Sequence, residues 1–479
     1  MERIFPEGKK VYFLDTSVIM HDPEAIERLS ADGNIAVILI HVLAELDKSK
    51  KFRDQGGINS RTASRLLDSY REIGKLNEGV ETKSGGRVVV DCDGHEEYFN
   101  DRLIGLDKTV DNRIVATAIW WKENSRGKYE KVAVVTKDIN LRVVANTFGV
   151  EAEDYERDKR IKRIDELYPG STKIILPDKD AGILTELPQK KSVSIDHLSP
   201  EGRDMFKGLY PNECVYLDFS GKRSLAIYKK KSRGIVWAGK PSKGGDDRGV
   251  FPTNDEQVFE YALLTDSTIP LSTVTGPAGT GKTLISLLAG INQLDYGDGK
   301  GLYKTVRIYR PNVELGNSLG YLPGTMGQKF EPWMEPIFDN LSLIISGGSY
   351  AEICGKPKGE ISESDAAKAS IEMLIERGLL SIQPINYARG RSLHNSFIII
   401  DEAQNLTPHE VKTLVTRVGR NTKIVLTGDP TQIDNPYLDA VSNGLTHAVE
   451  RLKGQGWAAS ITLRIGERSL VAERAAALL

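Results

Sequence analysis

The chain has 479 residues, of which 40% are hydrophobic, and its 64 basic residues nearly balance its 66 acidic ones. At roughly 150 residues per domain, this length predicts about three domains with packed cores. The balanced charge excludes a polycationic nucleic-acid binder, so any nucleic-acid surface must be a local patch.

The cysteines are few and widely separated. Cys92, Cys214 and Cys354 have neither disulfide-framework nor zinc-ligand spacing, a distribution typical of a reducing compartment. The N-terminus lacks an apolar signal region, and no apolar run reaches the ~18 residues that a membrane span needs. We therefore expect a soluble, cytoplasmic protein with no membrane segment.

Residues 1–165 alternate short apolar strands with helical segments, which predicts a parallel α/β sheet. The expected strands are Lys10–Leu14, Asn34–Ile40 and Lys131–Thr136, and the clearest helix is Val110–Lys122. Four acids follow this pattern: Asp15 and Asp138 at strand ends, and Glu45 and Asp111 in the first turns of helices. Because sites in such sheets form at the carboxyl ends of strands, the four acids are expected to converge.

Converging carboxylates repel one another and are tolerated chiefly where a divalent cation neutralises them. Oxygen ligands favour Mg²⁺ or Mn²⁺, and one or two such ions can support hydrolysis of a phosphodiester. Any one of these acids could instead be a partner of a helix dipole. The set of four is harder to explain in that way.

Four segments resemble, in order, the acidic motifs of PIN-domain ribonucleases. They are VYFLDTS (11–17), LAELD (43–47), DNRIVA (111–116) and TKDINLR (136–142). The resemblance implies that Asp15, Glu45, Asp111 and Asp138 are metal ligands of an endoribonuclease. Asp47 and Asp107 are expected at the surface, and residues 77–107 are expected to be an insertion without an assigned role.

Residues 166–250 are expected to form a small β-rich linker module. Its predicted strands are Lys173–Leu176, Cys214–Phe219 and Arg223–Lys229, separated by Pro and Gly turns. The segment Gly221–Lys243 has eight basic residues and no acid, with Tyr228 and Trp237 interspersed. It could bind RNA by phosphate contacts and base stacking, or it could be a solvated hairpin face.

Residues 251–479 contain a nucleotide-binding motif. An apolar strand, Ile269–Val274, leads into GPAGTGKT and then into an apolar helix, Leu284–Leu294. This is the context of a P-loop, in which backbone N–H groups and a helix N-terminus hold phosphate. The predicted ATP-binding residues are Gly276, Pro277, Ala278, Gly279, Thr280, Gly281, Lys282 and Thr283. Lys282 would contact the β- and γ-phosphates, and Thr283 would ligate Mg²⁺.

A second buried strand, Ser396–Ile400, ends in Asp401 and Glu402. These acids predict a Walker B motif, with Asp401 holding Mg²⁺ and Glu402 polarising the attacking water. The GDPTQ element that ends in Gln432 resembles motif III of superfamily 1 helicases, which implies a γ-phosphate sensor. Gln257 lies where helicases of this kind carry a glutamine that pairs with the adenine edge.

Combined with YRPNVE (309–314), LGYLPG (319–324) and the segment Tyr387–Asn395, these motifs closely resemble the PhoH family. The whole chain is similar to bacterial PIN–PhoH fusion proteins. The resemblance implies an ATP-dependent RNA helicase joined to a metal-dependent ribonuclease, with a PIN-like sheet, a small β-rich module and a RecA-like ATPase core.

The C-terminal domain has room for one RecA-like core, whereas superfamily 1 helicases combine two. A cationic residue from a neighbouring subunit would then complete the ATP site, which predicts a homo-oligomeric ring, with a hexamer as the expected form. Arg464 and Arg468 are the candidate fingers, although each could instead be a surface arginine.

Two other functions remain open from the sequence. The chain could be an ATP-gated RNA-binding or remodelling oligomer in which the PIN acids hold metal without catalysis. It could also be a nuclease in which ATP controls only assembly. An ATPase assay with and without RNA distinguishes the helicase from this last function.

Overall fold

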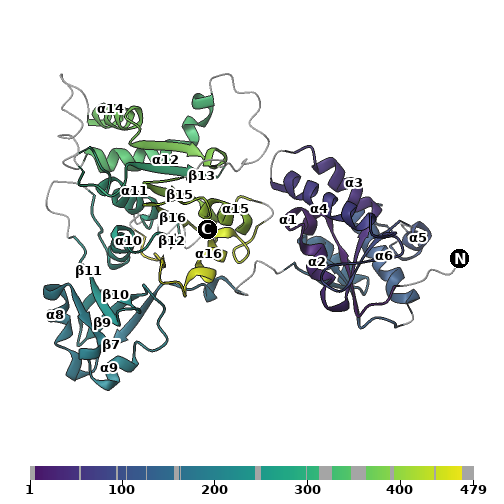
Figure 1. Ribbon diagram of the computed structural model, residues 1–479, viewed down its shortest axis with the longest axis horizontal. Coiled ribbons are helices and arrows are strands. Elements are labelled where there is room, and N and C mark those ends of the chain that lie inside the picture. Colours follow the sequence, from purple (N-terminus) through teal and green to yellow (C-terminus); the bar gives the residue numbers. More distant parts are fainter. Residues whose placement is uncertain are drawn as a thin grey trace. The chain divides into compact units, whose positions relative to one another are not determined.

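The computed structural model describes residues 6–52, 55–92, 95–103, 105–125, 127–155, 161, 163–242, 250–297, 299–311, 326–346, 363–388, 393–435 and 438–466. The chain divides into two compact units, Met1–Arg157 and Asp158–Leu479, shown in Figure 1. Both contain mixed α/β structure rich in parallel strands, which confirms the predicted fold class. Each unit is described by itself.

The first unit is built on a sheet of order β3-β4-β2-β1-β5-β6, parallel except for the β3–β4 pair. Its strands are β1 (Lys10–Leu14), β2 (Ile35–Leu39), β3 (Val80–Glu81), β4 (Arg87–Asp91), β5 (Lys131–Val135) and β6 (Glu151–Glu153). Its helices are α1 (Thr16–His21), α2 (Ala25–Leu29), α3 (Ile40–Ser49), α4 (Gln55–Arg71), α5 (Glu96–Arg102), α6 (Val110–Asn124) and α7 (Ile139–Thr147).

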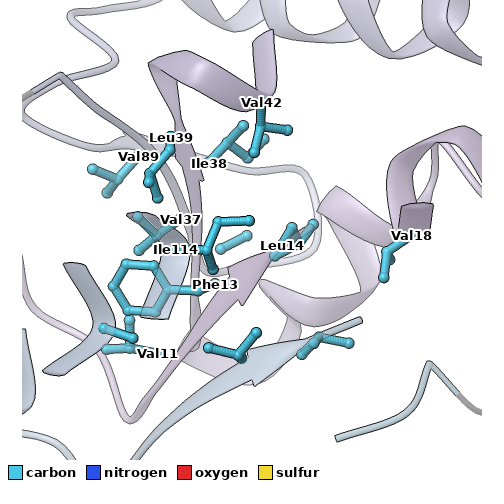
Figure 2. Packing of buried hydrophobic residues seen from close by; sticks show 14 of the residues in the cluster. Val11, Phe13, Leu14, Val18, Val37, Ile38, Leu39, Val42, Val89 and Ile114 are labelled. Carbon is cyan, nitrogen blue, oxygen red and sulfur yellow. The ribbon is translucent and has the colours of Figure 1, made fainter. Parts of the chain in front are cut away.

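Buried apolar side chains cover the central strands of this sheet. All five residues of β2 are buried, as expected for a strand with helices on both faces. Figure 2 shows Phe13 grouped with Val37 and Ile114, which come from β1, β2 and α6. This packing fixes the carboxyl ends of β1 and β5, from which the predicted acids follow.

Two details of the first unit differ from the sequence prediction. Residues 77–107, expected to be an insertion without a role, contribute to the sheet, because β4 pairs with β2 and α5 packs on α6. Glu45 does not lie in a first turn, because α3 begins at Ile40 directly after β2. Glu45 is therefore more than one turn into the helix, and its side chain reaches the site from there.

The second unit contains two sheets. The smaller has the order β7-β9-β10-β11-β8, and the larger has the order β14-β13-β15-β16-β12-β17 with parallel neighbours throughout. The smaller sheet comprises β7 (Ser171–Ile175), β8 (Ser192–Ser194), β9 (Cys214–Phe219), β10 (Lys222–Lys229) and β11 (Gly234–Gly239), with helices α8 (Ile183–Lys190) and α9 (Pro200–Asp204).

The larger sheet belongs to the predicted ATPase core. Its strands are β12 (Leu271–Thr275), β13 (Thr305–Arg310), β14 (Leu380–Pro384), β15 (Ser396–Ile400), β16 (Lys423–Gly428) and β17 (Ala458–Thr462). The helices are α10 (Asp255–Thr265), α11 (Lys282–Asn292), α12 (Met326–Ser346), α14 (Glu363–Glu376), α15 (Pro408–Val415) and α16 (Gly444–Leu452).

The small β-sheet and the ATPase core are packed together. Tyr216 of β9 meets Phe259 of α10 edge-to-face at 5.0 Å, and the buried Cys214 belongs to the same apolar cluster. In Figure 1 the strands of the small sheet lie next to α10. The contact of the partly buried Tyr216 with the buried Phe259 makes the small sheet a packed part of this unit rather than a loose linker.

The contact continues along the edge of the larger sheet. The amide of Thr462, in β17, donates to the Pro169 carbonyl at 2.9 Å, and the side-chain amide of Asn212 donates to the carbonyls of Gly456 and Ala458. A Cβ on Gly170 would lie 1.8 Å from the Ser460 carbonyl oxygen, so this close approach requires glycine.

Candidate active sites

Asp15 directly follows β1, and three hydroxyl groups surround the acids at this end of the sheet. Thr136 donates to Asp15 Oδ2 at 2.7 Å, Ser17 donates to the same oxygen, and Thr16 donates to Glu45 Oε2 at 2.5 Å. Asp138 caps the N-terminus of α7 by accepting from Asn140 N. The hydroxyls hold two of the acids in defined orientations.

The pKa of Asp111 reflects the charges of the three other predicted acids. Burial, together with the charges of Asp15, Glu45 and Asp138, raises the pKa of Asp111 to about 6. Asp111 therefore lies within electrostatic reach of the three other predicted acids, as carboxylates of a shared site do. Their electrostatic repulsion is what a divalent cation would relieve, so this donor set is chemically suited to such an ion.

Within the described residues, no group of three or more His, Cys, Asp or Glu side chains is assembled to hold a metal ion. Hydrogen bonds account for part of this separation, because one carboxylate oxygen of Asp15 and one of Glu45 accept from neighbouring Ser or Thr hydroxyls. Binding a cation would require the acids to draw together.

The second site lies at the carboxyl ends of β12, β15 and β16. Because these neighbouring strands are parallel, the P-loop after β12, Asp401 after β15 and Asp429 after β16 meet at one sheet edge. Thr283 Oγ1 donates to Asp401 Oδ1 at 2.9 Å, and Thr427 Oγ1 donates to the same oxygen at 2.8 Å. The two predicted Mg²⁺ ligands, Thr283 and Asp401, are thus in direct contact.

Lys282 begins α11 and is buried beneath the loop. Its ammonium donates to the carbonyls of Gly276 and Pro277 at 2.6 and 2.9 Å. Burial lowers the pKa of Lys282, while Asp429, Glu402 and Asp401 oppose that shift. An incoming triphosphate would offer this cation better partners than two neutral carbonyls.

A cavity of about 500 Å³ opens over the loop, which is within the ~300–1,000 Å³ range of small-molecule sites. Its walls include Ala278, Gly279, Gly281, Lys282, Thr283, Phe251, Gln257, Asn340, Glu402 and Gln432. The other predicted P-loop residues, Gly276, Pro277 and Thr280, complete the turn below it. Asn340 of α12 was missed by the sequence analysis, since nothing local distinguishes it from a surface residue.

Gln257 has a different environment from the one expected. Its Oε1 accepts from Thr253 N and Oγ1, and its Nε2 donates to the Thr280 carbonyl at 3.0 Å. The amide is therefore occupied in bracing the P-loop, and pairing with an adenine edge would require these bonds to be exchanged. Gly281, with φ 90°, leaves the room for this contact, because a Cβ there would lie 2.6 Å from Gln257 Nε2.

Three consecutive residues at the start of α10 make contacts to different parts of the unit. Asp255 pairs with Arg223 of β10 at 3.1 Å, Glu256 Oε2 accepts from the amides of Arg464 and Ile465 at 2.6 and 2.8 Å, and Gln257 holds the P-loop. The Arg464 side chain is exposed. Arg468, the other predicted finger, lies outside the described residues, as do Asn312, Glu314 and residues 319–324.

Gln404 and Arg310 are functional candidates to which the sequence analysis assigned no role. Gln404 Nε2 donates to Glu402 Oε2 at 2.6 Å and to the Gln432 carbonyl at 2.8 Å. Arg310, at the end of β13, lies 3.4 Å from Glu402 and 3.8 Å from Asp401. Their positions at strand ends beside the Walker B acids were the available signal.

The basic residues of the segment Gly221–Lys243 do not form one continuous RNA-binding surface. Lys229 pairs with Asp266, Arg233 pairs with Asp196 at 2.8 Å, and Lys230 donates to the Leu209 carbonyl. Tyr228 is only 5% exposed and packs against Phe206, so it cannot stack a base. Trp237 is partly exposed and stays available.

Comparison with known proteins identifies the families to which the two units are similar. Residues 12–156 match the PIN domain model and residues 250–476 match the model of PhoH-like proteins. Protein PhoH2 of Bacillus subtilis is 39% identical, over 98% of this chain and 100% of its own length. The chain belongs to the PhoH2 family.

Other PhoH2 proteins align over nearly the same length. Those of Thermobispora bispora and Mycolicibacterium smegmatis are 30% and 29% identical, over 98% and 97% of this chain and 96% of each relative. The PhoH2 family thus joins a PIN domain, a nuclease-like fold, to a P-loop ATPase domain in one chain. Among the helices described, none is long and apolar enough to cross a membrane.

Proposed function

We propose that this PhoH2 protein is an ATP-dependent RNA helicase coupled to a divalent-metal-dependent endoribonuclease. The observation that carries the proposal is the presence of two complete residue sets on separate units. In one unit the charges of Asp15, Glu45 and Asp138 act on Asp111. In the other, Lys282, Thr283 and Glu402 line one cavity, and Asp401 accepts a hydrogen bond from Thr283. Both substrates, RNA and ATP, are available in the cytoplasm, where we expect the protein to work.

In the ATPase unit, Lys282 and the P-loop amides would bind the phosphates of ATP. Thr283 and Asp401 would hold Mg²⁺, which neutralises phosphate charge when bound. Glu402 would orient the attacking water, and its contact with Arg310 would then be released. Gln432 lines the same cavity and is joined to Glu402 through Gln404, which suits a residue that relays the state of the γ-phosphate.

In the PIN unit, Asp15, Glu45, Asp111 and Asp138 would hold Mg²⁺ or Mn²⁺, which supports phosphodiester hydrolysis by stabilising the leaving oxygen. Ser17 and Thr136 orient Asp15, and Thr16 orients Glu45. These hydroxyls set which carboxylate oxygens face the cation and which face the protein.

We further propose a homo-oligomeric ring, with six subunits as the expected number. One RecA-like sheet lies in this unit, and the exposed Arg464 follows β17 at the sheet edge that carries the P-loop. An arginine presented to a neighbouring cavity is worth on the order of 10³–10⁵ in rate for such enzymes.

The deciding experiment follows labelled RNA with Mg²⁺, with and without ATP, for wild type, Asp15→Asn and Lys282→Ala. Asp15→Asn should lose cleavage and keep RNA-stimulated ATP hydrolysis, while Lys282→Ala should lose hydrolysis and unwinding. Asp107→Asn, at an exposed aspartate outside the acidic set, is the matched control and should retain both activities.

Two results would replace this proposal. RNA binding without cleavage under any divalent cation would favour an ATP-gated RNA-remodelling oligomer with a non-catalytic PIN site. Cleavage with ATP hydrolysis that RNA never stimulates would favour a nuclease whose assembly alone depends on ATP.

A further inference from the structure

A second pocket lies on the small β-sheet of the ATPase unit. It has a volume of about 680 Å³ and is bounded by β10, β11, α8 and the first residue of α10. The residues that matter for its chemistry are Trp237, Ser224, Arg223, Lys240, Asp218 and Asp255. The sequence analysis considered RNA for the whole segment Gly221–Lys243 without identifying this pocket, and the family comparisons assign the pocket no ligand.

The Trp237 ring supplies a flat, partly exposed surface in this pocket. The Lys191 ammonium lies 3.8 Å from the ring centroid, and the backbone amide of Trp237 donates to the Lys191 carbonyl at 2.9 Å. This contact occupies one face of the indole, and at the exposed Lys191 it is weak, so a nucleobase could displace the ammonium or use the other face. An aromatic face is what a nucleobase stacks on without regard to its identity.

Ser224 is a polar group that points to a ligand. It is only 5% exposed and lines the pocket, and its hydroxyl has no hydrogen-bond partner among the described residues. A buried hydroxyl without a partner costs free energy, which a ligand donor or acceptor would recover. The pocket therefore offers both a stacking surface and a hydrogen-bonding group.

Both acids that line the pocket are paired with basic side chains. Asp218 is paired with Arg223 at 2.7 Å and with Lys173 at 2.9 Å, and Asp255 is paired with Arg223 at 3.1 Å. These contacts leave part of the Arg223 donor set for a phosphate oxygen. The exposed Lys240 adds a second cation at the pocket wall.

We propose that this pocket binds a nucleobase and its adjoining phosphate from single-stranded RNA. The inference rests on the proposed function, because it takes RNA as the substrate. Trp237 stacks the base, Ser224 hydrogen-bonds its edge or sugar, and Arg223 with Lys240 contacts the backbone. Asp255, which closes the pocket, lies two residues before Gln257, so an RNA bound here sits against the helix that braces the P-loop.

The test measures binding of a short labelled oligoadenylate and oligouridylate to the full chain by fluorescence anisotropy, with metal removed by chelation to prevent cleavage. Trp237→Ala should weaken binding of both oligomers by about tenfold or more, since stacking is insensitive to sequence. Trp237→Phe should restore most of the affinity. Lys240→Glu, at an exposed position, should weaken binding and reduce its salt dependence.

Trp457→Ala removes another partly exposed tryptophan of the same unit and is the matched control; it should bind RNA like wild type. If Trp237→Ala and Lys240→Glu both bind with wild-type affinity, the pocket does not bind RNA, and the proposed function is unaffected. Failure of wild type to bind either oligomer would instead contradict the proposed function. Competition by AMP or UMP at concentrations similar to the oligomers would show that the pocket takes a free nucleotide, and RNA would be wrong as its occupant.

Discussion

Gln404 donates a 2.6 Å hydrogen bond from its amide nitrogen to Oε2 of Glu402. The same nitrogen reaches the Gln432 carbonyl, and Gln404 Oε1 accepts from the Asp429 amide at 3.2 Å. One side chain therefore links the proposed water-activating acid to the segment after β16. This makes Gln404 a positioning residue for hydrolysis.

Gln404→Leu is expected to lower kcat for ATP hydrolysis by about 10–100-fold with little change in KM for ATP. The reason is that Glu402 loses a charge-assisted hydrogen bond of roughly 1.5–3 kcal/mol while the phosphate-binding loop is untouched. Steady-state kinetics of Gln404→Leu and of Gln455→Leu, an exposed matched control, checks this. An equal loss in both variants, or a rise in KM alone, would contradict the positioning role.

Lys229→Glu is expected to destabilise the ATPase unit by about 2–4 kcal/mol. Lys229 is mostly buried and bonds both Asp266 and Asn212, so reversal of its charge leaves buried partners unmatched. Lys231→Glu, at an exposed position of the same segment, should shift stability by less than about 0.5 kcal/mol. Thermal unfolding of both variants measures the difference, and similar melting temperatures would show that Lys229 is a surface residue.

Lys423 gives a prediction about pH. Burial lowers its pKa to about 7, partly offset by Asp266, and its ammonium donates to the carbonyls of Leu263 and Asp266. The pKa of Lys423 is thus lower in the folded chain than in the unfolded chain, which binds more protons between about pH 7 and 10. Stability contributed by this residue must therefore rise with pH across that window.

Chemical denaturation at pH 7.5, 8.5 and 9.5 should show wild type gaining stability over Lys423→Met by on the order of 1 kcal/mol per pH unit. Lys304→Met, an exposed matched control, should show no such trend against wild type. A constant difference between wild type and Lys423→Met would mean that the buried lysine does not titrate in this range.

Much of the site could be predicted because its residues follow buried strands. The apolar runs before Lys282, Asp401 and Asp429 are long enough to be recognised, and parallel pairing then brings their ends together. Glu45 was placed in the wrong turn because the boundary between β2 and α3 has no capping residue to mark it.

Other features depend on contacts between segments far apart in the chain. The Gln257 amide is used by Thr253 and Thr280, and the basic residues near β10 are used by acids such as Asp196 and Asp266. Local sequence cannot indicate which polar side chains will form hydrogen bonds or ion pairs with distant segments in the folded protein. For the same reason, β4 was overlooked, since Val88–Val90 is short and is recognisable as a strand only through its pairing with β2.

The ring predicts complementation between two inactive proteins. Lys282→Ala subunits keep Arg464 and Arg468, whereas an Arg464→Ala, Arg468→Ala double mutant keeps its P-loop. Mixing them should restore part of the ATPase activity, because each mixed contact pairs an intact loop with an intact finger. Full activity from wild type that light scattering shows to be monomeric would exclude the shared site, and mixtures that stay inactive would exclude these arginines.

The hydrogen bond from Thr462 to Pro169 limits how such subunits can meet. An exposed edge strand can pair with the same strand of another molecule, and repeated pairing leads to aggregation. Here Pro169 and Gly170, which directly precede β7 of the small sheet, lie against β17, and glycine at position 170 allows the backbones to approach. A neighbouring subunit could therefore not extend the sheet along β17 without displacing these contacts, which favours recognition through side chains.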